Sequence, residues 1–152
     1  MATLAPTFRA ESQKLHREHQ ALEKDLLALK CALGRVVCYA EVFADLSSAE
    51  QVRHLGRRLA EQFPEHCCRE EVQLLNPVSR VSPELADFVG EMKRQHGELL
   101  DQLDSFCLAV EKLNASTDLD AAVCDVKEQG NNLLDEMRRH VATEERELSG
   151  FL

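Results

Sequence analysis

The fold is decided by the nine-residue stretch His66-Cys67-Cys68-Arg69-Glu70-Glu71-Val72-Gln73-Leu74. Its pattern returns near the end of the chain, in the stretch His140-Val141-Ala142-Thr143-Glu144-Glu145-Arg146-Glu147-Leu148. In both stretches a histidine, a glutamate four positions later and a leucine four positions after that share one face of a helix, because an α-helix repeats every 3.6 residues. Each stretch therefore predicts a helix that places polar side chains on its inward stripe.

A second pair of segments repeats in the same way. The segment His19-x-x-Leu22-x-x-x-Leu26-x-x-Leu29 matches the segment His96-x-x-Leu99-x-x-x-Leu103-x-x-Phe106. His19 precedes His66 by 47 residues and His96 precedes His140 by 44 residues, so the order and the separations agree. The sequence therefore predicts two equivalent helix pairs that are related by a pseudo-two-fold axis.

The first half of the chain predicts two long helices. The first is expected to start near Pro6 and to run beyond Tyr39, because its leucines follow helical spacing. The second is expected to start at a Ser47-Ser48 cap, to kink at Pro64 and to end at Asn76-Pro77.

The second half predicts another two helices. Ser82-Pro83-Glu84 combines a capping serine, a proline at the first helical position and an acid in the first turn. A polar loop at Asn114–Asp118, with Thr117 as the expected cap, precedes the fourth helix. Four helices joined by short loops predict an all-α, antiparallel up-down four-helix bundle. Residues 1–152 are expected to form a single domain.

Composition excludes several classes of protein. The chain has 152 residues and a formal net charge of −9, which is unlike the basic surface that binds phosphate backbones. No apolar run approaches the length of a membrane span, and the N-terminus lacks the features of a signal peptide. We therefore expect a cytosolic protein that binds neither nucleic acid nor membrane, while a homodimer is left open.

Six cysteines occur, and none forms a C-x-x-C pair: Cys31, Cys38, Cys67, Cys68, Cys107 and Cys124. Without an export signal, we expect reduced and mostly buried thiols. Cys67 and Cys68 stand beside His66, so a redox element at this point is an alternative to a purely structural role.

Six polar residues on the inward stripes point to metal binding: His19, His66, Glu70, His96, His140 and Glu144. A buried carboxylate costs several kcal/mol unless it is paired or coordinated. Lysine and arginine do not occupy these stripes, so internal salt bridges are hard to arrange. A pair of divalent cations would neutralise both glutamates, and imidazole with carboxylate suits iron, manganese or zinc.

We assign two histidines to each metal ion, with Glu70 and Glu144 as bridges. This arrangement leaves room for a bridging oxygen species and for a small exogenous molecule. His54 lies off its stripe and is expected to be exposed to solvent. His16 shares a face with His19, so it is either a ligand or site-lining residue, or else a surface residue.

The sequence resembles the hemerythrin-like (HHE cation-binding) family from about His16 to Leu148. The resemblance rests on four motifs: Leu15-His16-Arg17-Glu18-His19, His66-x-x-x-Glu70-Glu71, Gln95-His96-Gly97-Glu98-Leu99 and His140-x-x-x-Glu144-Glu145. It implies a four-helix bundle around a non-haem di-iron centre, with the six residues above as ligands.

Two positions depart from the oxygen-carrying members of that family. Those proteins have a histidine four residues after the one on the third helix, where this chain has Leu100. They also end with HxxxxD, whereas this chain has His140-x-x-x-Glu144. The ligand pattern is more similar to the di-iron domain of the iron–sulfur cluster repair proteins, and the similarity is confined to that domain.

Several functions fit this pattern. The favoured hypothesis is a di-iron protein that binds or reacts with O2, NO or peroxide in sensing, stress protection or iron supply. A second hypothesis is catalytic turnover at the same centre, such as NO reduction or peroxide removal, although the sequence contains no separate proton-donor or electron-partner motif. The alternative is a structural or interaction bundle that holds zinc or another divalent metal without redox chemistry.

Overall fold

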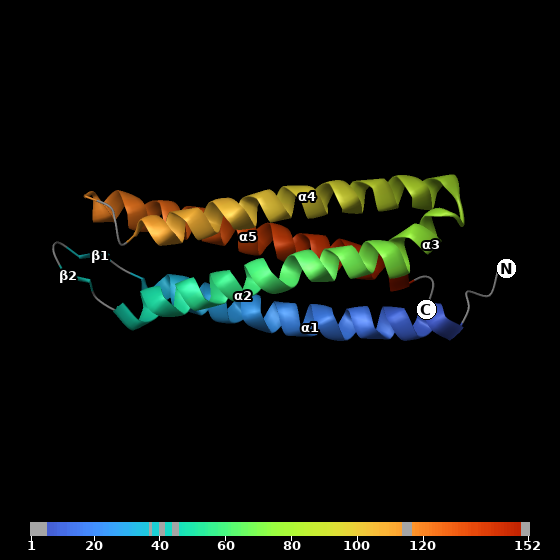
Figure 1. Cartoon of the computed structure of the whole chain (residues 1–152), viewed down its shortest axis with the longest axis horizontal. Helices are drawn as coiled ribbons and strands as arrows, with labels where there is room; N and C mark the ends of the chain where they lie inside the picture. The colour runs from blue at the N-terminus through green and yellow to red at the C-terminus, as the bar shows by residue number, and fades with distance from the viewer. Residues whose placement is uncertain (1–5, 37, 40–41, 44–45, 114–116, 150–152) are drawn as a thin grey trace.

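A computed structural model describes residues 6–36, 38–39, 42–43, 46–113 and 117–149. Four long helices lie side by side: α1 (Pro6–Arg35), α2 (Leu46–Glu70), α4 (Pro83–Lys112) and α5 (Leu119–Leu148). They alternate in direction, and α1 and α4 each pack against both α2 and α5 (Figure 1). The predicted antiparallel four-helix bundle is confirmed.

The first helix is shorter than predicted, because α1 ends at Arg35 rather than beyond Tyr39. A short hairpin follows, in which β1 (Cys38–Tyr39) pairs antiparallel with β2 (Val42–Phe43). Gly34 weakens the helix at its end, and the β-branched and aromatic residues after it favour extended backbone.

The second helical segment differs from the prediction at both ends. α2 begins at Leu46, so the helix starts before the predicted Ser47-Ser48 cap, and both serines lie in its first turn. After Glu70 the backbone widens into a π-helix, η1 (Glu71–Leu75), and continues as α3 (Asn76–Ser79). Proline is tolerated in the first turn of a helix, so the helical backbone continues past Asn76-Pro77, where it was predicted to end.

The start of α4 confirms the predicted cap, because the Ser82 hydroxyl accepts a hydrogen bond from the Leu85 amide at 3.2 Å. At α5 the cap is Asp118, whose carboxylate accepts from the Ala121 amide at 3.1 Å. The prediction of Thr117 was therefore wrong by one position. The middle of the predicted loop, residues 114–116, lies outside the described residues.

The interior of the bundle contains two apolar clusters. The larger one includes Leu26, Phe63, Leu99 and Met137, and the smaller one includes Leu15, Leu74, Met92 and Leu148. Along α1, α4 and α5, and along α2 with its continuation η1, the predicted polar core residues fall between members of the two clusters. The fold therefore holds a layer of buried histidines and glutamates between two apolar clusters. Within the described ranges, no helix has the length and hydropathy to cross a membrane.

Candidate metal centre

All four long helices contribute side chains to the polar layer. α1 supplies His19, α2 supplies His66 and Glu70, α4 supplies His96, and α5 supplies His140 and Glu144. All six residues are buried, and none exposes more than 8% of its surface. The structure therefore brings the six predicted residues into one interior site.

The two glutamates lie between the histidines. Oε2 of Glu70 lies 3.3 Å from Nε2 of His66 and 3.3 Å from Nε2 of His96. Glu70 therefore contacts imidazoles from both halves of the internal repeat, as a bridging ligand would.

Glu144 has the corresponding position on the other side. Its Oε1 lies 3.3 Å from Nε2 of His19, and its Oε2 lies 3.4 Å from Nε2 of His140. The side chains form two overlapping groups whose potential ligand atoms lie within 4.8 Å of one another: Glu70, His96, His140 and Glu144 in one, and His19, His66 and Glu70 in the other. Two cation positions that share carboxylates fit this arrangement.

Several buried polar atoms of this layer have no hydrogen-bond partner among the described residues. They are Nε2 of His19, His96 and His140 and both carboxylate oxygens of Glu70 and Glu144. Leaving one such atom unsatisfied costs about 1–3 kcal/mol, so seven together would be a heavy penalty without a ligand. Imidazole nitrogen and carboxylate oxygen are a donor set that iron, manganese and zinc accept, so the residues fit a bound metal pair.

The other ring nitrogen of each histidine is held by a residue from a neighbouring helix. Nδ1 of His19 lies 3.1 Å from Glu145, Nδ1 of His66 lies 2.9 Å from Glu18, and Nδ1 of His96 lies 2.8 Å from Glu71. Nδ1 of His140 lies 2.9 Å from the amide oxygen of Gln95. An Nδ1–H that donates to an acceptor leaves the Nε2 lone pair free for a metal, and such partners fix the orientation of ligating histidines.

These outer partners were not predicted from the sequence. Each of them is adjacent in sequence to one of the six site residues: Glu18, Glu71, Gln95 and Glu145. The doubled glutamates Glu70-Glu71 and Glu144-Glu145 were a visible signal, because the repeat preserves both members of the pair.

The carboxyl groups of the site influence each other's ionisation. Burial and the neighbouring Glu70 raise the pKa of Glu144 well above its ordinary value. Burial opposes ionisation of Glu70 as well, but its proximity to Glu144 and to the imidazoles of His66 and His96 lowers the pKa of Glu70. Without a metal the closeness of the two carboxyl groups therefore favours protonation of Glu144, and a bound cation would oppose it.

Burial, and then the positive charge that His96 can carry, lower the pKa of His140 to about 4. A neutral imidazole is the form that binds a metal. His140 is therefore ready for coordination over the whole physiological pH range.

Aromatic and apolar side chains enclose the layer. Phe63 stacks on the ring of His66, with centroids 6.0 Å apart, and lies edge-on to His96 at 6.5 Å. Met92, Leu99 and Met137, which were predicted to surround the ligands, are buried, and Leu22 is partly buried. These side chains, together with the burial of the six residues, shield most of the polar atoms from solvent.

Two hollows lead from the surface to opposite sides of the layer. One, of about 330 Å³, lies between α1 and α2 and is lined by Leu22, Phe63 and His66 among others. The other, of about 250 Å³, lies between α4 and α5 and reaches Leu99 and His140. Small molecules can therefore approach a histidine of each half.

Two further histidines remain outside the layer. His54 is exposed, as predicted. The imidazole of His16 is 57% exposed, and its Nδ1 lies 2.9 Å from Glu145, the partner of His19. His16 is therefore a surface residue that contacts the partner of a site histidine, and it is not one of the buried potential ligands.

The cysteines differ from the prediction. Cys67 is buried, but Cys31, Cys68 and Cys124 are exposed and Cys107 is intermediate, so the thiols are not mostly buried. These five are free thiols, and Cys38 is not among the side chains described. Burial, and then the charge of Glu70, raise the pKa of Cys67, so its thiol is inert rather than reactive.

Comparison with protein families gives one match. Residues 10–152, nearly the whole chain, match the family described as the Hemerythrin HHE cation binding domain. Comparison with curated proteins and with solved structures gives no match.

Proposed function

The chain belongs to the hemerythrin HHE cation-binding domain family, and we propose that it is a non-haem di-iron protein that binds or reacts with a small molecule such as O2, NO or peroxide. The observation that carries the proposal is a cluster of buried nitrogen and oxygen atoms that have no hydrogen-bond partner among the described residues. Three imidazole nitrogens and four carboxylate oxygens, all buried, face one another without hydrogen-bond partners among the described residues. A cation-binding domain whose polar layer is built in this way is suited to a pair of cations.

The ratio of ligands to cations favours a reactive centre over a closed structural one. The two groups of potential ligand atoms contain four and three residues and share Glu70. If Glu144 is shared as well, each of two ions has four protein ligands, which leaves coordination positions for other molecules. The side chain at position 100, where oxygen carriers have another histidine, is a leucine packed against the larger apolar cluster. It adds no donor atom to the layer.

A bound iron pair supplies one-electron chemistry and open positions for a small ligand. The protein orients the imidazoles through Glu18, Glu71, Gln95 and Glu145. Phe63 and its apolar neighbours shield the polar layer, while the two hollows are large enough for molecules of a few atoms. These properties support a role in sensing, in stress protection or in iron supply.

The test is anaerobic loading with ferrous iron, followed by exposure to O2 and, separately, to NO. We expect optical and paramagnetic spectra to change with each gas, and to lose those changes in His19→Ala. His54→Ala is the matched control, because His54 is exposed and distant from the layer. Unchanged spectra in a fully loaded protein would reject the proposal, and one tightly held zinc without iron would favour the structural alternative.

A further inference from the structure

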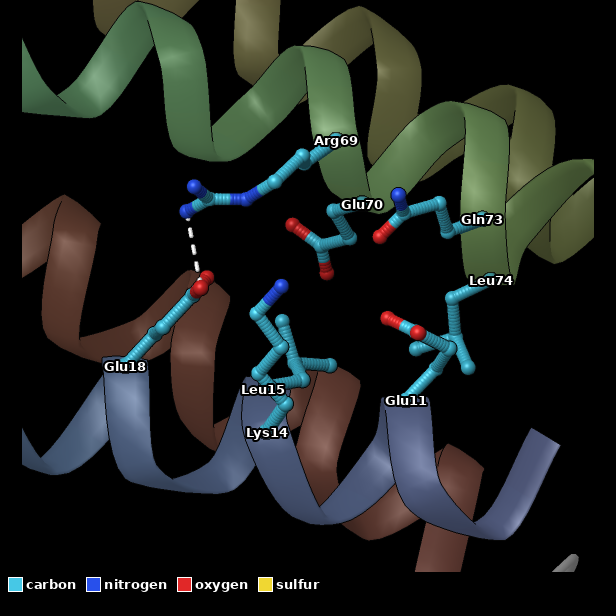
Figure 2. A pocket seen from close by; sticks show the side chains of 8 residues that line it. All are labelled: Glu11, Lys14, Leu15, Glu18, Arg69, Glu70, Gln73 and Leu74. Atoms are coloured by element: carbon cyan, nitrogen blue, oxygen red, sulfur yellow. Dashed lines mark ion pairs between the residues drawn. The ribbon is translucent and has the colours of Figure 1, made fainter. Parts of the chain in front are cut away.

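A narrow opening leads from the surface to Glu70 between the first half of α1 and the end of α2 (Figure 2). Its volume is about 20 Å³, roughly the space that one water molecule occupies. α1 provides one wall, and α2 with the following π-helix provides the other. The lining residues are Glu11, Lys14, Leu15, Glu18, Arg69, Glu70, Gln73 and Leu74.

Glu70 forms the inner end of this opening. Its side chain is fully buried, both of its oxygens lack a hydrogen-bond partner, and its carboxylate points into the space between the helices (Figure 2). Glu70 also belongs to both groups of potential metal ligands. The opening therefore ends at the carboxylate that two bound cations would share.

Two further carboxylates line the opening closer to solvent. Glu18 is held by Arg69 at 2.7 Å and by His66 at 2.9 Å, so its position is fixed. Glu11 lies seven residues, or about two helical turns, earlier on α1, and no ion pair involving it or Lys14 is found among the described residues. Glu11 and Glu18 therefore place carboxylate oxygens on either side of the buried Glu70 carboxylate, nearer to solvent than Glu70 itself (Figure 2).

The internal repeat shows that this opening belongs to one half of the molecule. The residues of α4 that correspond to Glu11 and Glu18 are Phe88 and Gln95. Phe88 is partly buried and packs against the smaller apolar cluster, and Gln95 donates to Glu91 at 2.8 Å. The second half therefore keeps the ligands of the layer but replaces two outer carboxylates with neutral side chains.

We propose that this opening is the port through which a divalent cation enters the centre. The cation first meets the outer carboxylate of Glu11 or of Glu18 and passes from there to Glu70, exchanging water for carboxylate oxygen at each step. Lys14 is exposed, and its positive charge repels an incoming cation. Its long, flexible side chain allows the ammonium group to move out of the path. The inference rests on the proposed function, because it requires that cations bind the layer at all.

The experiment measures the rate at which metal-free protein takes up ferrous iron under anaerobic conditions, by stopped-flow absorbance. Glu11→Lys should slow uptake about tenfold and Lys14→Glu should accelerate it, with both effects shrinking at high salt. Glu147→Lys is the control, because Glu147 is exposed on α5 at the position that corresponds to Gln73. The final iron content and the urea midpoint of each variant are measured alongside.

Opposite changes of rate at positions 11 and 14, with an unaltered rate in Glu147→Lys and equal final iron content, support the port. Rates that stay within twofold of wild type in both variants overturn it, and so does an equal slowing by Glu147→Lys, which would indicate a general effect of net charge. If wild-type protein takes up no metal, the proposed function fails together with the port. Full loading at unaltered rates rejects the port alone.

Discussion

His140 is oriented by the neutral amide of Gln95, whose oxygen lies 2.9 Å from Nδ1 of the imidazole. The corresponding pair in the other half is His66 and Glu18, in which the acceptor is a carboxylate at the same distance. A carboxylate that accepts from a ligating histidine makes the imidazole a stronger donor to the metal. The two halves therefore present ligands of the same type but of unequal strength.

Gln95→Glu is expected to tighten binding at the position near His140, and Glu18→Gln to weaken binding near His66. Outer-partner changes of this kind alter metal affinity about 10–100-fold. Competition titration with a chromophoric chelator measures both steps of binding in wild type and in the two variants. Equal affinities for the two steps in wild type, unaffected by either substitution, would contradict the asymmetry.

The metal-free protein should lose stability in mild acid because of His140. Its pKa is about 4 in the folded state against 6.5 ordinarily, so between these values the unfolded chain binds a proton that the folded chain does not. His140 therefore does not lower the unfolding free energy above about pH 6.5, and it lowers it progressively as the pH falls toward 4. By pH 5 this loss amounts to about 2 kcal/mol of unfolding free energy relative to neutral pH.

Urea titrations at pH 7.5 and pH 5, on wild type and His140→Gln, measure this effect. The variant should lose less stability between the two pH values than the wild type does. An identical loss in both proteins would show that other groups govern the acid sensitivity.

Gly130 marks a close approach of three helices away from the polar layer. A methyl group added there would lie 2.6 Å from Cδ1 of Leu33 and 3.0 Å from the ring of Phe106. Gly130→Ala should therefore destabilise the protein by about 1–3 kcal/mol. Gly90→Ala is the control, since an added methyl meets nothing within 4 Å and should stabilise α4 by up to about 1 kcal/mol. Urea unfolding distinguishes the two, and a stabilising Gly130→Ala would refute the packing described.

Cys67 and Cys68 should differ sharply in reactivity. Cys67 is buried and its pKa is raised, whereas Cys68 is exposed. In folded protein at pH 8, iodoacetamide should modify Cys68 in Cys67→Ala but leave Cys67 unmodified in Cys68→Ala. Mass spectrometry of the digested peptides measures this. Rapid modification of Cys67 would revive the redox element that its place beside His66 suggested.

The sequence was sufficient to predict those parts of the structure that depend on periodicity. Four helices and one interior layer follow from spacing alone, because residues four apart on a helix must share a face. The cap at Ser82 was predictable as well, because a capping hydrogen bond depends only on residues within one helical turn.

Features that depend on how the helices face each other were not predicted. Glu18 reaches His66 across the α1–α2 interface, and Gln95 reaches His140 across the α4–α5 interface. Such contacts depend on helix rotation and separation, which spacing along one helix does not determine. The widening of the backbone at η1 and the hairpin after Arg35 likewise depend on the balance between local preference and packing. That the six residues coordinate metal stays a prediction.

Metal content per chain after anaerobic loading and desalting tests that prediction most directly. It is measured by elemental analysis on wild type, on Glu70→Ala/Glu144→Ala, and on His54→Ala as a surface control. Because both glutamates lie between histidines of the two halves, we expect two ions per chain in wild type and in His54→Ala. The double variant should lose both ions together. At most one ion in wild type, or two ions retained without the glutamates, would contradict a shared, carboxylate-bridged metal pair.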